Sequence, residues 1–338
     1  MLHRANVAPF ALGAAVAFIL SAAFQWAPSS SFSFPGPHST SVGQTTISKP
    51  LDGFREAWTL LGSPEPSTKR FASSPSRVCI MAADTRPITP VNSSTIPSEL
   101  DFRTFAVYHN LWWALRHGYN YRMVHTERIA GYSPIWSKTH AIRKLVSDPT
   151  CELVVFFDSD AYVTQPSYSL YDLLDRWNFH ERAAMLLSMD QPFHPMPQNQ
   201  NATNTGFMVF RSGAKAIQIL DDILACPEKI PECAQWKTIE KYEQTAFNLF
   251  VRPHLVEGEE LIIIPCDDAN GNFKNQWCHG KFVTHAWHAL ETVNERAAAI
   301  MIKETFAWLS QVFDGERVTI KPELPVISAV PVVAEQRR

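Results

Sequence analysis

The chain has 338 residues, of which 46% are hydrophobic and 19% are charged, and its formal net charge is −3 at pH 7. This length fits one large domain or two smaller ones, and the apolar fraction is enough for a sizeable core. The slightly acidic balance argues against nucleic acid as the main partner, because binding to phosphate backbones needs a basic surface. Neither glycine-rich phosphate motif, GxGxxG or GxxxxGK[ST], occurs in the sequence. Any bound phosphate must therefore be held by side chains and a metal.

The N-terminal region is expected to anchor the chain in a membrane. Residues 7–26 carry no charged side chain, and they follow a short segment, residues 1–6, that contains Arg4. A helix of this length covers about 30 Å, the thickness of the hydrocarbon layer. A cleaved signal peptide is the alternative, although its apolar part is usually shorter. We favour a transmembrane signal anchor, with residues 1–6 as a cytoplasmic tail and the bulk of the chain in the lumen.

The glycosylation and cysteine patterns agree with a luminal location. Two sequons begin at Asn92 and Asn201, and the six cysteines form no CxxC pair and no Cys/His zinc pattern. Cys79 lies within an apolar run and is expected to be a buried thiol, whereas Cys151 fits either state. Disulfides are expected where two cysteines flank a loop, which gives the pairs Cys226–Cys233 and Cys266–Cys278.

The composition changes along the chain and divides it into regions. Residues 27–76 are rich in Ser, Pro and Thr and are predicted to form a flexible luminal stem. Residues 77–320 are predicted to form the folded domain, and residues 321–338 a loose tail. No internal repeat is evident.

Within the folded region, apolar runs alternate with segments of helical period. Strands are predicted over residues 78–83, 119–125, 153–157, 183–188, 206–211, 261–265 and 281–284. Helices are predicted over residues 101–117, 136–146, 168–177, 214–225, 243–250 and 291–313. This alternation predicts an α/β fold, a mostly parallel sheet with helices on both faces.

The most informative stretch is residues 153–160, which read LVVFFDSD. Five strand-forming residues end in two carboxylates, Asp158 and Asp160, and ligands of α/β sheets collect at the carboxyl ends of strands. Two such acids suit Mg²⁺ or Mn²⁺, which typically hold a diphosphate. Capping of the following turn is the simpler interpretation. A haloacid-dehalogenase-type phosphatase is another, but its DxDxT or DxDxV loop has no place for Tyr162 and usually begins the domain.

Three further motifs follow. Asn204-Thr205-Gly206 precedes an apolar strand, and it is either an ordinary turn or an amide beside a close-approach glycine at a sugar site. Glu243-Gln244 opens a helix, where acids are favoured by the dipole, or else it faces a sugar or acceptor. His285 lies just past the strand predicted over residues 281–284, where it is either structural or a third metal ligand, and the nearby Lys281 could meet phosphate.

The order of these motifs resembles the metal-dependent nucleotide-sugar glycosyltransferases of the GT-A fold. The chain is most similar to the galactosyl/mannosyltransferase family 34 of Golgi type II proteins. Residues 108–119 (YHNLWWALRHGY) are similar to that family's helix ending in HGY. The segment Trp136-Ser137-Lys138 is similar to the family's W-x-K segment. The resemblance covers residues 77–290. Nucleotide-diphosphosugar transferases, which share a DxD and an N-x-G block, resemble the chain nearly as well.

The resemblance implies transfer of a hexose or pentose from a nucleotide diphosphate to a glycan, with retention at the anomeric carbon. It implies a Golgi membrane location, single-pass type II, and a Mn²⁺ or Mg²⁺ cofactor held by Asp158, Asp160 and His285. The donor nucleotide sugar would be met by Asp84, Lys138, Asp158, Asn204, Gly206 and Lys281. The candidates for the sugar or acceptor side of catalysis are Asp190, Glu243 and Gln244. A non-catalytic, membrane-anchored carbohydrate-binding protein remains the alternative from another class.

Overall fold

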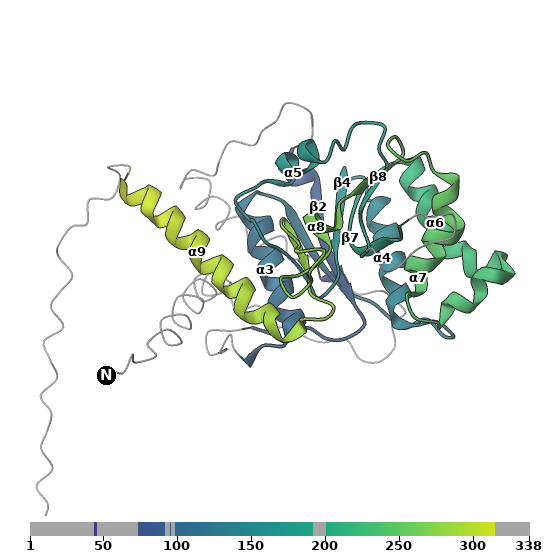
Figure 1. Ribbon diagram of the computed structural model, residues 1–338, viewed down its shortest axis with the longest axis horizontal. Helices are drawn as coiled ribbons and strands as arrows, with labels where there is room; N and C mark the ends of the chain where they lie inside the picture. Colours follow the sequence, from purple (N-terminus) through teal and green to yellow (C-terminus); the bar gives the residue numbers. More distant parts are fainter. Residues whose placement is uncertain (1–43, 46–73, 92–94, 96–98, 192–200, 315–338) are drawn as a thin grey trace, which may run out of the picture.

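The computed structural model describes residues 44–45, 74–91, 95, 99–191 and 201–314 (Figure 1). The expected cytoplasmic tail, membrane anchor, most of the stem and the C-terminal tail lie outside these residues, and so does Asn92. Among the described residues, no helix has the length and apolar character to span a membrane.

A seven-stranded sheet forms the centre of the molecule, in the order β1-β3-β2-β4-β7-β6-β8. Strand β7 runs antiparallel to its neighbours β4 and β6, and the pairs β3–β2, β2–β4 and β6–β8 are parallel. The prediction of a mostly parallel sheet is therefore confirmed. The strands are β1 (Gln44–Thr45), β2 (Val78–Asp84), β3 (Asn120–His125), β4 (Leu153–Phe157), β6 (Met185–Met189), β7 (Thr203–Arg211) and β8 (Leu261–Ile264).

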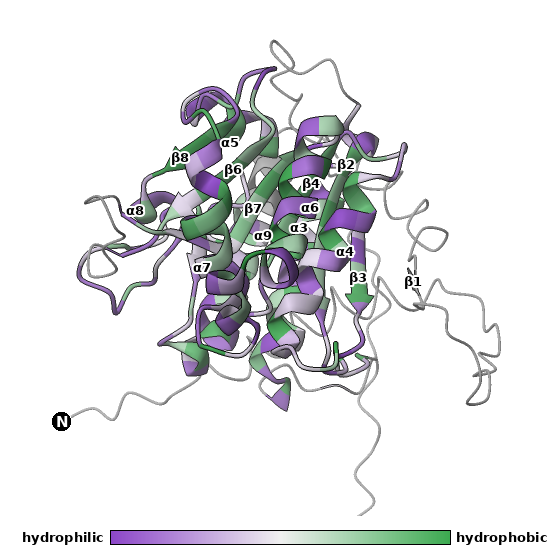
Figure 2. Ribbon diagram, turned by 90° about the vertical axis from the view of Figure 1, so that its right-hand side faces the viewer, coloured by the Kyte–Doolittle hydropathy of each residue, from purple (hydrophilic) through white to green (hydrophobic). Residues whose placement is uncertain are grey.

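Helices cover both faces of this sheet, as the sequence predicts (Figure 1). Val78 and Ile80 of β2 face the core under α3 and α9, whereas Cys79 and Met81 face the core under α4 and α6. Because both faces of the central strands are buried, their sequences are continuous apolar runs, and Figure 2 shows them as hydrophobic strands beneath amphipathic helices. The helices are α3 (Phe102–Arg116), α4 (Ser137–Val146), α5 (Leu170–Arg176), α6 (Ala214–Lys229), α7 (Tyr242–Ala246), α8 (Cys266–Ala269) and α9 (Val293–Asp314).

A second, two-stranded sheet lies beside the carboxyl end of β4. Strand β5 (Ala161–Val163) pairs antiparallel with β9 (Val283–His285), and Ala161 lies opposite His285. Sequence reasoning missed β5, because three residues are too short for a periodic pattern. This pairing places the end of β9 directly next to the Asp158-Ser159-Asp160 segment.

Three local predictions need correction. Strand β7 begins at Thr203, so Asn204-Thr205-Gly206 belongs to the strand and is not a turn before it. The helix predicted from residue 243 is α7 followed by a π-helix over Phe247–Val251. The helix predicted over residues 214–225 continues to Lys229 and includes Pro227.

All six cysteines are paired. The expected disulfides Cys226–Cys233 and Cys266–Cys278 are confirmed. The prediction of a free thiol at Cys79 is wrong, because Cys79 is bonded to Cys151 across 72 residues of sequence. The parallel pairing of β2 and β4 brings the two Cα atoms to 5.6 Å, a contact that spacing along the chain does not reveal.

Candidate active site

The polar residues singled out by the sequence gather where β4 ends. Strand β4 stops at Phe157, and the chain passes through Asp158, Ser159 and Asp160 before entering β5. The amide of Asp158 donates to the carbonyl of Gly206 on β7 at 2.8 Å, which fixes the turn to the neighbouring strand. The site thus lies at a carboxyl edge of the sheet, as expected for an α/β protein.

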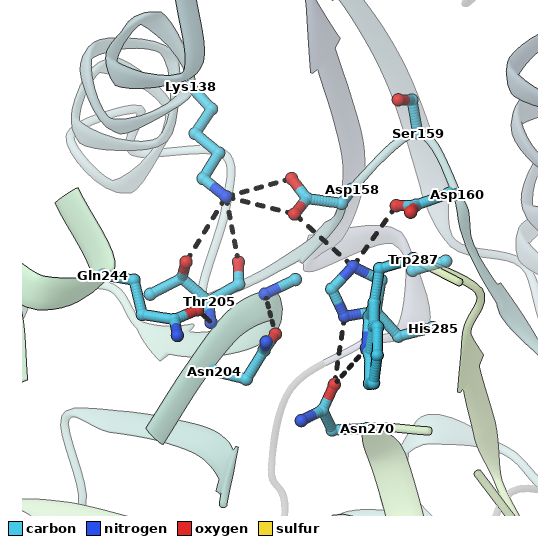
Figure 3. A network of polar contacts seen from close by, with 12 residues as sticks. Lys138, Asp158, Ser159, Asp160, Asn204, Thr205, Gln244, Asn270, His285 and Trp287 are labelled. Carbon is cyan, nitrogen blue, oxygen red and sulfur yellow. Dashed lines mark hydrogen bonds and ion pairs between the residues drawn. The ribbon is translucent and has the colours of Figure 1, made fainter. Parts of the chain in front are cut away.

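Asp158, Asp160 and His285 form a cluster that fits a divalent cation. One ligand atom from each residue lies within 4.8 Å of the others. His285 Nε2 is 3.2 Å from Asp160 Oδ1 and 3.7 Å from Asp158 Oδ2 (Figure 3). Two carboxylate oxygens and one imidazole nitrogen form a donor set that suits Mn²⁺ or Mg²⁺.

The charges of this cluster compensate one another in the protein alone. Burial by itself raises the pKa of Asp160 and lowers that of His285, since both lose contact with water. Their mutual attraction outweighs burial, so the pKa of Asp160 lies below 3.8 and that of His285 above 6.5. A bound cation would take over the role of the imidazolium toward the two carboxylates.

Gly206 makes room for the His285 ring. A Cβ atom at Gly206 would lie 2.1 to 2.6 Å from three ring atoms of His285, far closer than real Cβ contacts. The backbone of β7 therefore forms the wall against which the imidazole packs. The motif Asn204-Thr205-Gly206 therefore has a glycine at its third position because a larger residue would overlap the His285 ring. Sequence reasoning had assigned this glycine to the sugar site.

Asn270 orients His285, and sequence reasoning missed it. The Nδ1–H of His285 donates to Asn270 Oδ1 at 3.1 Å, which leaves Nε2 as the ring nitrogen that faces the carboxylates. Trp287 Nε1 donates to the same oxygen at 3.3 Å. The Asn270 amide donates in turn to the carbonyl of Met189 at 3.0 Å and to Asp190 Oδ1 at 3.3 Å. The only sequence signal was its place in the loop between Cys266 and Cys278.

Lys138 is buried and joins the aspartates to Glu243. Its Nζ lies 3.0 and 3.1 Å from the two oxygens of Asp158 and 3.0 Å from Glu243 Oε1. The hydroxyl of Thr205 donates to the same Glu243 oxygen at 2.9 Å. Burial lowers and the two carboxylates raise the pKa of Lys138, with a net upward shift, so the ammonium stays charged. Burial also raises the pKa of Glu243 despite the lysine.

Glu243 has a second oxygen with unused hydrogen-bonding capacity. Among the described residues, no group hydrogen-bonds to Glu243 Oε2, although it is buried. A buried carboxylate oxygen without a partner costs free energy, which a ligand hydroxyl would recover. Glu243 also lines a cavity.

The neighbouring motif residues form a hydrogen-bonded chain across β7 and α7. Gln244 Oε1 accepts from the amide of Thr205 at 3.2 Å, and Gln244 Nε2 donates to Asp190 Oδ2 at 3.1 Å. Asn204 Oδ1 accepts from the amide of Gly206 at 2.8 Å, so this side chain is partly used in holding the strand. The structure thus brings Asn204, Gln244 and Asp190 together beside the cation cluster.

Two cavities meet at this cluster. The larger, about 550 Å³, is lined by Asp84, Arg86 and Arg128 among others. The smaller, about 350 Å³, is lined by Asp190, Asn204 and the segment 240–244 among others. The residues common to both linings form their shared wall, and they are Ile135, Lys138, Asp158, His285 and Trp287.

Asp84 ends β2 inside the larger cavity and is held by an arginine. Arg86 donates through Nε to Asp84 Oδ1 at 2.9 Å and through Nη2 to Oδ2 at 2.7 Å, and it reaches Ser159 Oγ at 3.2 Å. Burial raises the pKa of Asp84, but the hydrogen bonds and the charge of Arg86 lower it by more. The net shift of the pKa is downward, so the carboxylate is ionised. Arg86 was missed by sequence reasoning, which had no pattern for a cation two residues beyond a strand.

Lys281 is the one predicted site residue that the structure does not bring to the cluster. Its Nζ pairs with Asp267 Oδ2 at 2.5 Å, and the side chain is 56% exposed. It lines neither of the two cavities. Because β9 runs antiparallel to β5, residues before Val283 move away from Asp160, so proximity to His285 in sequence does not place Lys281 at the site.

Asn201, the asparagine of the second sequon, is exposed, whereas Asn204 is buried in β7. The two residues therefore differ in accessibility although they are close in sequence. The side chain of Thr203, the third residue of the sequon, is buried and donates to Asn248 Oδ1 at 3.0 Å.

The fold is similar to that of GT-A glycosyltransferases. A glycosyltransferase involved in the glycosylation of the major capsid of PBCV-1 is similar in structure, with 16% identity, coverage of 67% of this chain and 98% of its own, and a TM-score of 0.50. Mouse xyloside xylosyltransferase 1 (12% identity, 62% and 98% coverage, TM-score 0.40) and the galactosyltransferase LgtC (12%, 65% and 95%, 0.38) align less closely.

The model of the galactosyl transferase GMA12/MNN10 family matches residues 93–288, more than half of the chain. The chain belongs to this family. No curated protein matches the sequence. Membership in a transferase family decides for a glycosyltransferase over the phosphatase and the non-catalytic carbohydrate-binding protein that the sequence left open.

Proposed function

We propose that the protein transfers a hexosyl or pentosyl group from a nucleotide diphosphate sugar to a glycan, with a divalent cation at Asp158, Asp160 and His285. The observation that carries the proposal is the position of these three ligands, which lie at the junction of two cavities. A reaction between two substrates needs two adjoining sites, and the leaving diphosphate must lie where they meet.

The larger cavity is the proposed donor site. It contains two arginines, and the positive charge of guanidinium groups attracts phosphate oxygens. Asp84, fixed by Arg86, presents a carboxylate that accepts hydrogen bonds from the nucleoside. When bound, Mn²⁺ or Mg²⁺ offsets the negative charge that develops on the diphosphate as it leaves.

The protein's own residues hold the cation ligands in place. Lys138 positions Asp158 through both carboxylate oxygens, Asn270 sets the tautomer of His285, and Gly206 provides the space for its ring. Glu243 lines the smaller cavity and is proposed to face the glycan acceptor there. Retention of anomeric configuration rests on the family resemblance, and no base is assigned to the acceptor hydroxyl.

We further propose the domain organisation expected from the sequence. Residues 1–6 form a cytoplasmic tail, residues 7–26 a signal anchor and residues 27–76 a stem, with the catalytic domain over residues 77–320 in the Golgi lumen. Three disulfides among the described residues support an oxidising compartment. Expression of the full chain with a C-terminal reporter, followed by protease protection of microsomes, tests this topology, and digestion of the reporter in intact vesicles would contradict it.

The activity is tested by release of nucleoside diphosphate from a panel of sugar nucleotides, with Mn²⁺, with Mg²⁺ and with EDTA. Turnover of one donor that requires a divalent cation is the expected result, and NMR of the product then reads the anomeric configuration. A second readout is the melting temperature, which Mn²⁺ should raise in the wild type. Donor turnover that is unchanged in EDTA would contradict the role of the cation.

A further inference from the structure

The segment that enters α7 has a strained backbone. Lys241 has φ of +71° and ψ of −4°, and Tyr242 follows with φ of +37°. Neither residue is glycine, so both pay a conformational cost that only surrounding contacts can sustain. Among the described non-glycine residues only one other, Asn178, has a positive φ, and asparagine adopts this conformation most readily. Two consecutive strained residues that line a cavity point to a function for their side chains.

Contacts at both ends hold this segment in place. Tyr242 packs against the apolar core beneath α4 and α6, and its amide donates to the carbonyl of Ile239 at 3.1 Å. The carbonyl of Lys241 accepts from the amide of Thr245 at 3.0 Å, which starts the helical turn. These contacts direct the Lys241 side chain toward Asp190, and its ammonium lies 3.9 Å from Asp190 Oδ2.

The Lys241 ammonium still has its hydrogens available for a ligand. At 3.9 Å it attracts Asp190 but is too far away to hydrogen-bond to it. No hydrogen bond from Lys241 Nζ to another described residue is present. Asp190 is also held by hydrogen bonds, which its oxygens accept from Gln244 Nε2, Asn270 Nδ2 and the amide of Gln191. The carboxylate is therefore rigid, and the ammonium beside it is able to bind a further oxygen.

The composition of the smaller cavity defines the class of ligand. Outside the wall shared with the donor cavity, it has three carboxylates, Asp190, Glu240 and Glu243, against the one ammonium of Lys241. This excess of negative charge disfavours an anionic ligand. Three amides add donors and acceptors, and Trp287 and Tyr242 add apolar ring surface. Apolar faces with polar groups at the edge match a neutral pyranose.

We propose that Lys241 and Asp190 together bind two neighbouring hydroxyl groups of a neutral glycan acceptor in the smaller cavity. The ammonium donates to one hydroxyl oxygen, and the carboxylate accepts from the hydroxyl beside it. The strained backbone at Lys241 and Tyr242 carries the ammonium that lies 3.9 Å from this carboxylate. This inference rests on the proposed transferase function and adds the residues that select the acceptor.

The test uses the full chain, the donor identified in the sugar-nucleotide panel, and the methyl glycosides of glucose, galactose and mannose as acceptor probes. The variants are Lys241→Ala and Lys241→Gly, with Lys215→Ala as the matched control. Lys215 also pairs with one carboxylate, Glu260, and its side chain is 37% exposed, as is that of Lys241, but it lies on α6 and lines neither cavity of the site.

The expected result is a rise of about tenfold or more in the KM for the best methyl glycoside in both Lys241 variants, as for loss of a charged hydrogen bond. The donor KM of the Lys241 variants should change less than twofold. Both KM values of the Lys215→Ala variant should also stay within twofold of wild type. Glycine adopts a φ of +71° without cost, so Lys241→Gly should melt at a higher temperature than Lys241→Ala. Removal of the hydroxyl that Lys241 contacts should raise the KM of the wild type for the methyl glycoside but should leave the KM of Lys241→Ala unchanged.

Three outcomes would overturn the inference. An unchanged acceptor KM in both Lys241 variants would show that the ammonium does not contact the acceptor. Donor hydrolysis that no neutral methyl glycoside stimulates in the wild type would show that the cavity takes another ligand, and the proposed donor chemistry would survive. Absence of any donor turnover in the wild type would contradict the proposed function itself, and this inference with it.

Discussion

The two cavities of the site share a wall but differ in the groups that each adds to it. Outside the shared wall, the larger cavity has two arginines, Arg86 and Arg128, together with Asp84 and Asp160, whereas the smaller has three acids, three amides and one lysine but no arginine. Guanidinium groups suit a diphosphate, and amides and carboxylates suit sugar hydroxyls. One edge of a sheet can thus bind two chemically different substrates side by side, because their ligands come from different elements.

The shared wall explains why the two cavities can act together. Lys138, Asp158 and His285 face both sides, and the cation cluster includes two of these three residues. A change in the wall should therefore affect both substrates, whereas a change in one lining should affect one substrate. The predictions below test this distinction.

The largest effect is expected for Asp160→Asn, which removes one charge of the cation cluster. Asp160 is partly buried and pairs with His285 at 3.2 Å, so the amide leaves the imidazolium with only Asp158 at 3.7 Å as an anionic partner. Affinity for Mn²⁺ should fall by at least about 100-fold, since loss of outer-shell partners alone costs 10- to 100-fold. Titration calorimetry with Mn²⁺ measures this directly, and wild-type affinity in a folded variant would remove Asp160 from the cation site.

Gly206→Ala should displace His285 from the shared wall, because Gly206 lies on β7 directly against the imidazole ring. The added methyl group overlaps the His285 ring at 2.1 to 2.6 Å, so the imidazole must leave its position. We expect a loss of roughly 1–3 kcal/mol in the free energy of unfolding, as for other overpacked sites, together with weaker Mn²⁺ binding. Denaturant titration and calorimetry measure the two effects.

Gly213→Ala is the control for this substitution, because nothing lies within 4 Å of a Cβ atom at Gly213. It should leave Mn²⁺ binding close to wild type, and its effect on the free energy of unfolding should be limited to the loss of a glycine at the N-cap of α6, about 1 kcal/mol. Equal behaviour of the two alanine variants would show that the close approach of Gly206 to His285 is unimportant.

Arg86→Ala should act on the larger cavity alone. It removes a guanidinium from the proposed diphosphate site and frees Asp84, so the donor KM should rise by about tenfold while the acceptor KM stays within twofold. Arg143→Ala is the matched control, because Arg143 forms a similar two-bond pair with Asp221 outside both cavities. If Arg86→Ala raised both KM values alike, the division into donor and acceptor cavities would be wrong.

The sequence predicted the elements of this site better than their contacts. The run from Leu153 to Asp160 contains both its strand and its acids, so local pattern was enough to find it. His285 was assigned through the order of motifs and family resemblance. The approach of Gly206 to His285, 79 positions away, depends on how β7 and β9 lie, and no local pattern records it.

The missed residues share a physical reason. Asn270 and the Cys79–Cys151 disulfide matter through contacts between segments that are distant in the sequence. Arg86 lies in an irregular segment after β2, where no periodic pattern marks its contact with Asp84. A lone asparagine in a loop looks the same in sequence whether it orients a ligand or faces water. Lys281 shows the converse error, because nearness in sequence to His285 suggested a shared role that the direction of β9 excludes.

The smallest effect is expected in the pH dependence of stability without a cation. The folded-state pKa of His285 lies above its usual 6.5 because of Asp160 and Asp158, so its charged form stabilises the fold. This contribution is complete below the unfolded pKa of about 6.5 and is lost as pH rises through the higher folded pKa. In EDTA, the free energy of unfolding should therefore fall across that window in the wild type, and less in His285→Gln. A cation that binds the neutral imidazole should instead gain affinity over the same window, since it no longer competes with a proton.

Denaturant titrations at several pH values, with EDTA and with Mn²⁺, measure both effects. As pH rises, the free energy of unfolding should fall in EDTA, and the stabilisation by Mn²⁺ should grow. Parallel curves in EDTA and in Mn²⁺ would mean that His285 does not exchange a proton for a cation at the shared wall.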